Sequence, residues 1–402
     1  MKKLLSLFVV LTFFFITDSH IFAQKSNPNL FGGLKFRNIG PAMTSGRIAD
    51  IAIHPNNENI WYVAVGSGGV WKTKNSGTTW KPIFENQKVY STGCITIDPN
   101  NPSTIWLGTG ENVGGRHAGF GDGVYVSHND GKSWKNMGLE NSEHLSKIIV
   151  HPENSDIIWV ASQGPLWSKG GDRGIYKSIN GGKTWQRTLG DSEWVGATDL
   201  LIDPTNPNIL YAATWQRHRT VAGYLGGGPG SGLHKSIDGG LTWKALKSGI
   251  PNSNLGKIGL AMSPFNPNVV YAAIELDRTK GGFFMTSNGG ESWVKQSDAV
   301  AGGTGPHYYQ EIIASPHHEG TIYFMNNSAL ESKNHGKTFE RMRRSNQHSD
   351  SHALVFKKSD PNYLLIGTDG GLYESFDGTE SWKYVRNLPI TQYFKIAVDD
   401  AK

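Results

Sequence analysis

An eight-residue pattern, Ser/Thr-x-Asn/Asp-x-Gly-x-Thr/Ser-Trp, recurs seven times in this 402-residue chain and constrains its fold more than any other feature. Successive copies begin 43 to 58 residues apart. Self-similarity at such a period is typical of repeat architectures, in which each unit packs against its neighbours. The copies are Thr73–Trp80, Ser127–Trp134, Ser178–Trp185, Ser236–Trp243, Thr286–Trp293, Ser332–Phe339 and Ser375–Trp382.

Each copy, called a box below, has the chemistry of a tight turn. The Asn or Asp side chain accepts backbone N–H bonds, and Gly permits a positive φ. Six of the 13 Trp residues end a box, so we interpret them as core residues and not as ligand contacts. The carboxylates of Asp238 and Asp377 are interpreted as structural, because the other five copies have Asn. The sixth box ends in Phe339, and the seventh has Thr379 where the others have Gly.

A strand pattern surrounds every box. An apolar run such as Ile51–Ile53 leads into a Pro/Asn turn, and a second run such as Ile60–Val63 follows. A third run enters the box and a fourth leaves it, which predicts an antiparallel meander of propeller-blade size. The modest apolar content of 37% and the 50 Gly residues suit short strands and many turns. We predict an all-β, seven-bladed β-propeller of four-stranded antiparallel blades, with each box at an outer turn.

The N-terminus has the pattern of an export signal. Lys2 and Lys3 precede an apolar run from Leu4 to Ile16, and Ala23 offers a small residue for cleavage. The alternative is a membrane anchor, but the run is short for a bilayer. We therefore predict a signal peptide over residues 1–23 and a secreted, periplasmic or cell-surface protein. No other segment is apolar enough to predict a membrane span.

The remaining boundaries follow from the repeats. Residues 24–33 are predicted to be a linker and residues 34–390 the propeller. Residues 391–402 contain an apolar run that looks like the first strand of a truncated further repeat. The chain is therefore expected to be a fragment of a longer protein. Leu34–Arg37 is a candidate for a strand that closes the ring.

Charge and cysteine content restrict the partners. The net charge of +5 is scattered, and the one cluster of three Arg near Arg341 is interpreted as a solvated loop. Nucleic acid is therefore not a predicted partner. Cys94 is the single cysteine and lies in an apolar run, which predicts a buried small hydrophobe.

The boxes and the Asp/His-Pro turns, such as Asp203-Pro204 followed by Asn206-Pro207, resemble those of the sortilin N-terminal domain, related bacterial Asp-box proteins and two-propeller xyloglucanases. The resemblance covers residues 34–400 and implies a propeller. It implies little about activity, because Asp boxes occur in binding proteins and glycosidases alike. The xyloglucanases carry a catalytic Asp where this sequence has Gly66, and their second acid lies in a second propeller. Sortilin-type receptors add a cysteine-rich module, which is not found here.

Candidate site residues lie in loops next to the first and second strands of each blade, where propellers bind ligands. Asp369 and Glu111 follow second strands and are the catalytic candidates, and the alternative for Asp369 is a turn residue before Gly370-Gly371. For the residues of the long loops, the alternative to ligand binding is that they only form flexible surface. The candidates for ligand binding are Arg47, Arg116, Glu193, Trp215, Arg217, His218 and Tyr308.

The segment before the first strand of the seventh blade predicts a possible metal site. Strand alternation would place His348, Asp350 and His352 on one face, where they could hold a divalent metal. Asp369 would be the fourth ligand. The alternative is ordinary hydrogen bonding in a loop, and no other cofactor is predicted.

Two function classes compete. The first expectation is a secreted, sortilin-like propeller that binds an extracellular peptide or glycan without catalysis. The alternative is a glycoside hydrolase acting on a β-glucan or related polysaccharide, which needs two carboxyl groups. Gly66 and the lack of a second propeller favour the binding protein.

Overall fold

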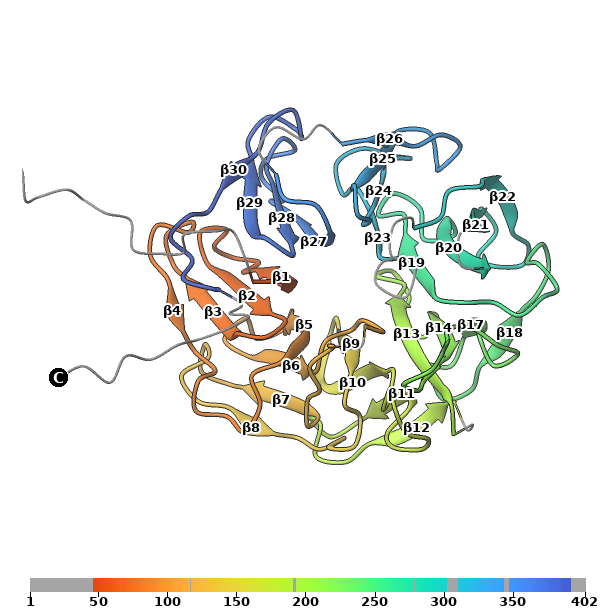
Figure 1. Cartoon of the computed structure of the whole chain (residues 1–402), viewed down its shortest axis with the longest axis horizontal. Helices are drawn as coiled ribbons and strands as arrows, with labels where there is room; N and C mark the ends of the chain where they lie inside the picture. Colours follow the sequence, from red (N-terminus) through yellow and green to blue (C-terminus); the bar gives the residue numbers. More distant parts are fainter. Residues whose placement is uncertain are drawn as a thin grey trace, which may run out of the picture. The chain divides into compact units, whose positions relative to one another are not determined.

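The computed structural model describes residues 46–391 except 116, 191–192, 278–279, 302–309 and 343–346. These residues form seven four-stranded sheets around a central axis, as Figure 1 shows. The predicted seven-bladed propeller is confirmed. Over the described ranges the protein is built without helices, so none is available there to cross a bilayer.

Each blade is an antiparallel meander of four strands, numbered in Figure 1. The innermost strands are β1 (Ile48–Ile53), β5 (Thr92–Ile97), β9 (Leu145–His151), β13 (Val195–Ile202), β19 (Ile258–Met262), β23 (Ile312–Ala314) and β27 (Ser351–Phe356). The second strands are β2 (Trp61–Val65), β6 (Ile105–Thr109), β10 (Asn154–Ser162), β14 (Leu210–Gln216), β20 (Val270–Asp277), β24 (Ile322–Phe324) and β28 (Leu364–Thr368).

The third strands enter the boxes and the outer strands leave them. The third strands are β3 (Gly69–Thr73), β7 (Val124–Ser127), β11 (Gly174–Ser178), β17 (Gly232–Ser236), β21 (Lys280–Thr286), β25 (Leu330–Ser332) and β29 (Gly371–Ser375). The outer strands are β4 (Lys81–Pro82), β8 (Lys135–Asn136), β12 (Gln186–Leu189), β18 (Lys244–Leu246), β22 (Val294–Ser297), β26 (Glu340–Arg341) and β30 (Lys383–Tyr384). Blade 4 carries an extra hairpin, β15 (His218–Arg219) and β16 (Tyr224–Leu225).

The core lies between the blades. Seven apolar clusters occur among the described residues, and each combines side chains from two neighbouring blades. Second strands such as β2 and β28 are therefore buried along their whole length. Burial on both faces explains why these segments read as continuous apolar runs in the sequence. Cys94 belongs to the cluster between blades 2 and 3 and is 1% exposed, as predicted.

The boxes form the predicted turns between third and fourth strands. In the first box, Thr73 Oγ1 accepts the N–H of Gly77 at 3.0 Å, and Asn75 Oδ1 accepts that of Thr79 at 2.9 Å. Gly77 has a φ of +75°, which favours glycine. The box Trp of the second blade donates from Nε1 to the Ile83 carbonyl of the first blade at 2.6 Å. The first box thus fixes its own turn, and the second box joins its blade to the preceding one.

The two box carboxylates serve the same turn chemistry. Asp238 accepts hydrogen bonds from the hydroxyl and the N–H of Thr242, and these hold its pKa well below the usual range. Asp377 accepts equivalent bonds from Ser381, which also lower its pKa. Both groups therefore remain ionised as turn acceptors.

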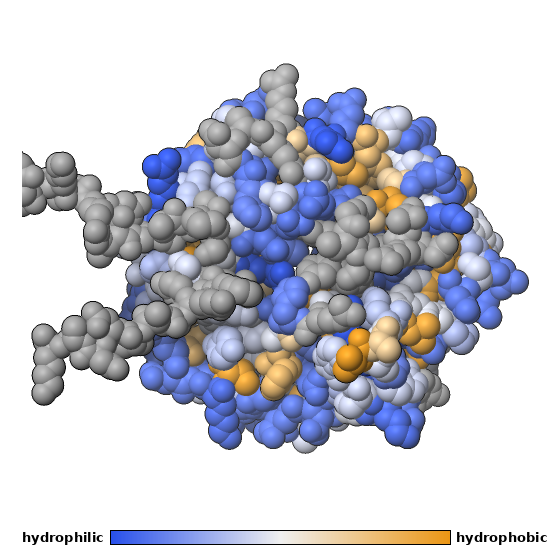
Figure 2. All heavy atoms as spheres, in the orientation of Figure 1, coloured by the Kyte–Doolittle hydropathy of each residue, from blue (hydrophilic) through white to orange (hydrophobic). Residues whose placement is uncertain are grey.

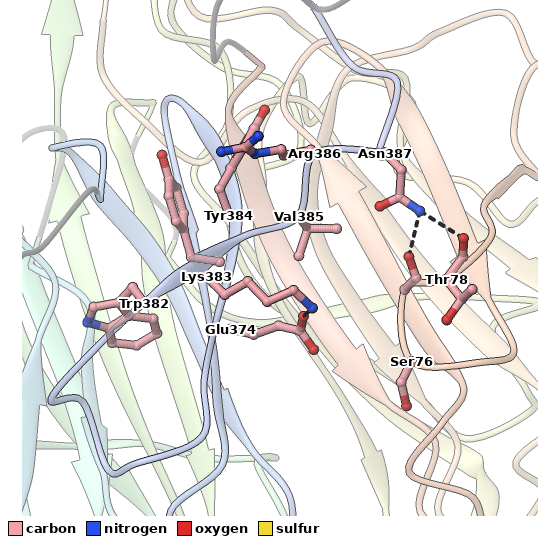
Figure 3. Close-up of a pocket in the computed structure, with 11 residues that line it drawn as sticks. Ser76, Thr78, Glu374, Trp382, Lys383, Tyr384, Val385, Arg386 and Asn387 are labelled. Carbon is pink, nitrogen blue, oxygen red and sulfur yellow. Dashed lines mark hydrogen bonds and ion pairs between the residues drawn. The ribbon is translucent and has the colours of Figure 1, made fainter. Parts of the chain in front are cut away.

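Within the described residues, blades 7 and 1 meet without exchanging a strand, since the sheet of blade 7 is β27-β28-β29-β30 and that of blade 1 is β1-β2-β3-β4. An apolar cluster that includes Ile48 and Leu365 fills the seam between them. Farther out is a cleft of about 870 Å³, drawn in Figure 3. There Asn387 Nδ2 donates to the carbonyls of Gly77 and Thr78, both at 2.8 Å. Apolar packing and side-chain bonds therefore join the two blades. Leu34–Arg37, the weak closure candidate, and residues 392–402 of the predicted truncated strand lie outside the described residues.

Candidate functional site at the channel mouth

Arg47 joins three blades at the start of β1. Its Nη1 lies 2.5 Å from Oε2 of Glu111 in blade 2, and its Nε lies 2.6 Å from Oδ1 of Asp369 in blade 7. The side chains of Arg47 and Glu111 are 11% and 5% exposed, whereas that of Asp369 is 31% exposed. The structure thus brings together three candidates that the sequence placed in separate loops.

The two carboxylates reach Arg47 because second strands end at the same rim of the ring. Asp369 directly follows β28, and Glu111 follows β6 after a single Gly. That residue, Gly110, has a φ of +81°, and a Cβ there would lie 1.7 Å from the carbonyl oxygen of Glu143. Only glycine fits at this position, so Gly110 permits the turn that directs Glu111 toward blade 1.

His352 completes the cluster from β27. Its Nε2 lies 2.8 Å from Oδ1 of Asp369, the oxygen that Arg47 also contacts, and its side chain is 4% exposed. Burial raises the pKa of Asp369, but the bonds from His352 and Arg47 outweigh it and hold that pKa well below the usual range. Because Asp369 stays ionised, His352 carries its proton on Nε2 and donates to it.

Ser67 is a contact that the sequence analysis missed. Its hydroxyl donates to Oε1 of Glu111 at 3.1 Å, so both carboxylate oxygens of Glu111 are bonded. A Cβ on the neighbouring Gly66 would lie 3.3 Å from Cδ of Glu111. The Glu111 carboxyl therefore lies beside Gly66, the position at which the resemblance to xyloglucanases had implied a catalytic Asp. A small cavity of about 130 Å³ adjoins this point and is lined in part by Ser67, Trp71 and Arg47.

His117 adds a second imidazole to the cluster. Its Nε2 lies 3.4 Å from Nη2 of Arg47. The sequence analysis did not name His117 as a candidate. Its neighbour Arg116, a predicted binding residue, lies outside the described residues, as does Tyr308.

The predicted metal triplet does not converge. β27 begins at Ser351, and Asp350 has a φ of +64°, so the strand alternation assumed for His348, Asp350 and His352 is broken. Asp350 instead accepts a bond from Asn327, while His348 Nδ1 contacts the carbonyl of Ser349. The described residues contain no group of three His, Cys, Asp or Glu side chains arranged to hold a metal ion. The divalent-metal prediction is thereby corrected, and His352 serves Asp369 instead.

Several predicted binding residues are part of the framework. Trp215 is 1% exposed and Arg217 is fully buried. Arg217 donates to the carbonyls of Val113 and Gly164. His218 packs against Trp194 with ring centroids 4.0 Å apart. The expectation that Trp215 and Arg217 face a ligand is therefore corrected, because their polar groups are directed into the protein.

Glu193 remains at the surface, in an ion pair with Lys169 at 3.2 Å. Both side chains are more than half exposed, and neither contacts the Arg47 cluster in the interactions that the structure records. Glu193 is thus separate from that cluster. Figure 2 shows hydrophilic colouring around the centre of the ring and hydrophobic patches farther out.

Charged groups also line the channel below the mouth. Asp50 accepts the N–H of Ile95 in blade 2 at 2.9 Å, and Asp199 accepts that of Leu260 in blade 5 at 2.8 Å. Burial raises the pKa of both carboxyls. Lys147 lies on the innermost strand β9, where its side chain is exposed. The protein around it removes part of its solvation, which lowers its pKa, but the charges of Asp199 and Asp50 raise that pKa more, so the net shift is upward. The sequence analysis did not identify this ionic group.

Comparisons with known proteins agree with the fold. A family model described as "Sortilin, neurotensin receptor 3" matches residues 122–252. An oligoxyloglucan-reducing end-specific xyloglucanase of Emericella nidulans is 22% identical over 221 residues, 50% of this chain and 24% of the relative. A xyloglucanase of a Paenibacillus species is 27% identical over 312 residues, 75% of this chain and 25% of the relative.

Solved structures give the same result. The crystal structure of an ancestral GH74 enzyme superimposes with a TM-score of 0.64 and 19% identity, over 86% of this chain and 47% of that one. The chain spans about a quarter of the length of the two curated relatives. The matches confirm the resemblance to sortilin-like and xyloglucanase propellers. They also overturn the first expectation of a non-catalytic binding protein, since the xyloglucanase relatives favour the glycoside hydrolase alternative.

Proposed function

We propose that this propeller belongs to a glycoside hydrolase that cleaves a β-glucan, with the Arg47 cluster at its reaction centre. The observation that carries the proposal is the convergence of two carboxyl groups, Glu111 and Asp369, on one guanidinium at the channel mouth. Glycosidases use such a pair, one carboxyl as proton donor and the other as base or nucleophile. The likeness to xyloglucanases supports a polysaccharide substrate.

The environment of Asp369 suits the base or nucleophile. His352 and Arg47 keep its pKa low, so it is ionised at neutral pH and cannot donate a proton. Its side chain is also the most accessible of the three. Asp369 is therefore the group that attacks the sugar or activates water.

Glu111 is the proton donor in this proposal. Arg47 and Ser67 hold both of its oxygens while the site is free of substrate. With Asp369 assigned as base or nucleophile, Glu111 is the second carboxyl of the pair and protonates the leaving oxygen.

Reducing-sugar release from a panel of β-glucans, including xyloglucan, tests the activity. We expect hydrolysis by the wild-type protein and a loss of about 100-fold or more in Asp369→Asn and Glu111→Gln. Asp298→Asn removes an exposed carboxylate paired with Lys295 in blade 5 and serves as the matched control. Absence of hydrolysis across the panel contradicts the proposal, and wild-type rates in both variants would place the chemistry elsewhere.

Substrates with different leaving groups separate the two roles. An aryl glycoside with a good leaving group needs little acid assistance, so Glu111→Ala should retain much of its activity on it. Asp369→Ala should lose activity on both substrates and recover part of it with azide, which replaces the missing carboxylate as nucleophile. The reverse pattern would exchange the roles.

An extracellular location fits a polysaccharide substrate. The export signal predicted over residues 1–23 would deliver the propeller outside the cytoplasm. We expect the mature protein to begin at Gln24. N-terminal sequencing of the protein from a secreting host checks this, and a retained Met1 contradicts it.

A further inference from the structure

Four successive carbonyls of one loop are held by side chains from other blades. The loop is Glu111–Gly114 in blade 2, and the donors come from blades 3 and 4. The bonds are His144 Nδ1 to the Glu111 carbonyl at 2.7 Å, Gln163 Nε2 to Asn112 at 3.1 Å, Arg217 Nη1 to Val113 at 3.2 Å, and Arg219 Nη2 to Gly114 at 2.8 Å.

The donors are buried. His144, Gln163, Arg217 and Arg219 are 2%, 1%, 0% and 7% exposed. A buried cation is costly unless its N–H groups are bonded. Burial lowers the pKa of Arg217 to about 9, so this group is still charged at neutral pH. Arg217 and Arg219 donate to backbone carbonyls of the loop, so the positions of the two guanidinium groups and of the loop depend on each other.

The held loop has Glu111 at its first position. The backbone oxygen of Glu111 is bonded to His144, and its N–H donates to the Gly119 carbonyl at 2.9 Å. Its carboxylate lies against Arg47 and Ser67. Glu111 is therefore fixed by blade 3 and its own blade through its backbone and by blade 1 through its side chain, while blade 4 holds the next residues of the loop, Val113 and Gly114.

We propose that Arg217 and Arg219, assisted by His144 and Gln163, are positioning residues that set the Glu111 carboxylate against Arg47. They act through the loop backbone, whose carbonyls accept their hydrogen bonds. The effect on hydrolysis rests on the proposed function, whereas the effect on the loop does not. Blade 4 thus contributes to a site formed by blades 1, 2 and 7.

Hydrogen exchange measured by mass spectrometry tests the positioning without any substrate. In Arg219→Ala we expect amides of the peptide over residues 110–118 to exchange about tenfold faster than in the wild type, because local opening becomes easier. Arg219→Lys, which restores one donor, should recover part of the protection. Lys235→Ala is the matched control, since Lys235 also donates to a backbone carbonyl, that of Gly289. Unchanged exchange in both Arg217→Ala and Arg219→Ala overturns the proposal.

A double-mutant cycle tests the effect on catalysis. Arg219→Ala should lower kcat about 10- to 100-fold, because a misplacement near 1 Å is enough for such a loss. In a Glu111→Gln background the same change should cost less than about twofold, since the group that it positions is already disabled. An undiminished effect in that background would overturn the proposal. If the wild type hydrolyses no β-glucan, the proposed function fails, and the exchange experiment alone decides the positioning role.

Discussion

His352 Nε2 and Arg47 Nε contact the same oxygen of Asp369, at 2.8 and 2.6 Å. His352 and Asp369 belong to the last blade of the ring, and Arg47 belongs to the first. The proposed nucleophile or base is therefore part of the seam where the ring closes. The cluster therefore needs blades 1 and 7 to be in contact.

Removing the guanidinium should shift the pH dependence of activity. Arg47 helps to lower the pKa of Asp369, so Arg47→Met should raise that pKa. Asp369 would then become ionised only at higher pH, and the acidic limb of the kcat/KM profile would move upward. Arg47→Lys retains the charge and should show a smaller shift. An acidic limb that stays in place in Arg47→Met would show that another group controls it.

One buried histidine and one half-buried histidine should make the fold sensitive to acid. Burial lowers the pKa of His144 to about 3 and that of His234 to about 4. Below an unfolded-state pKa of about 6.5, the unfolded chain binds protons that the folded protein cannot. The free energy of unfolding should therefore fall as the pH drops from about 6.5 to 4, by at most about 1.4 kcal/mol per pH unit for each histidine.

Denaturant unfolding between pH 4 and 7 measures this dependence. His144→Gln removes one titrating group and keeps a donor for the Glu111 carbonyl, so its curve should be flatter. His318→Gln, which changes an exposed histidine, is the matched control. Equal slopes in the wild type and His144→Gln would rule out His144 as a source of the pH dependence of the free energy of unfolding.

The seventh box contains a strained residue. Thr379 has a φ of +83° at the position that is Gly in the other boxes. A β-branched side chain is disfavoured in this conformation by about 1–2 kcal/mol. Thr379→Gly should therefore raise the free energy of unfolding, by about 0.5–1 kcal/mol after the entropy that glycine adds to the unfolded chain. The reciprocal change Gly77→Thr should destabilise, and a less stable Thr379→Gly variant would contradict the strain.

Lys147 should stabilise the centre of the ring. The buried carboxyls of Asp50 and Asp199 raise its pKa, so its contribution is present at neutral pH and is lost only as the pH rises through the raised value. Lys147→Met should lower the free energy of unfolding by about 1–2 kcal/mol, less than for a dry ion pair because the Lys147 side chain is exposed to solvent. Urea unfolding at pH 7 measures the change, with Lys244→Met on an outer strand as control. Equal losses in the two variants would assign no special role to Lys147.

The architecture follows from short stretches of sequence. A box needs only eight residues, and its bonds, such as Thr73 with Gly77 and Asn75 with Thr79, form within the turn itself. The second strands are continuous apolar runs because both of their faces are covered. Because these bonds form within a short stretch, the turn can be predicted from the sequence, and its sevenfold repetition predicts the number of blades.

The site depends on relations between blades, which sequence spacing does not encode. Arg47 lies 64 residues from Glu111 and 322 residues from Asp369, and the closed ring brings them together. Strand alternation suggested a metal triplet, but the backbone turns at Asp350, outside the strand. Arg217 looked like a ligand contact because an arginine in a Gly-rich loop usually faces solvent, yet carbonyls of two other blades accept its N–H groups. Side-chain direction and burial are set by packing across the blades, so they became known only from the folded ring.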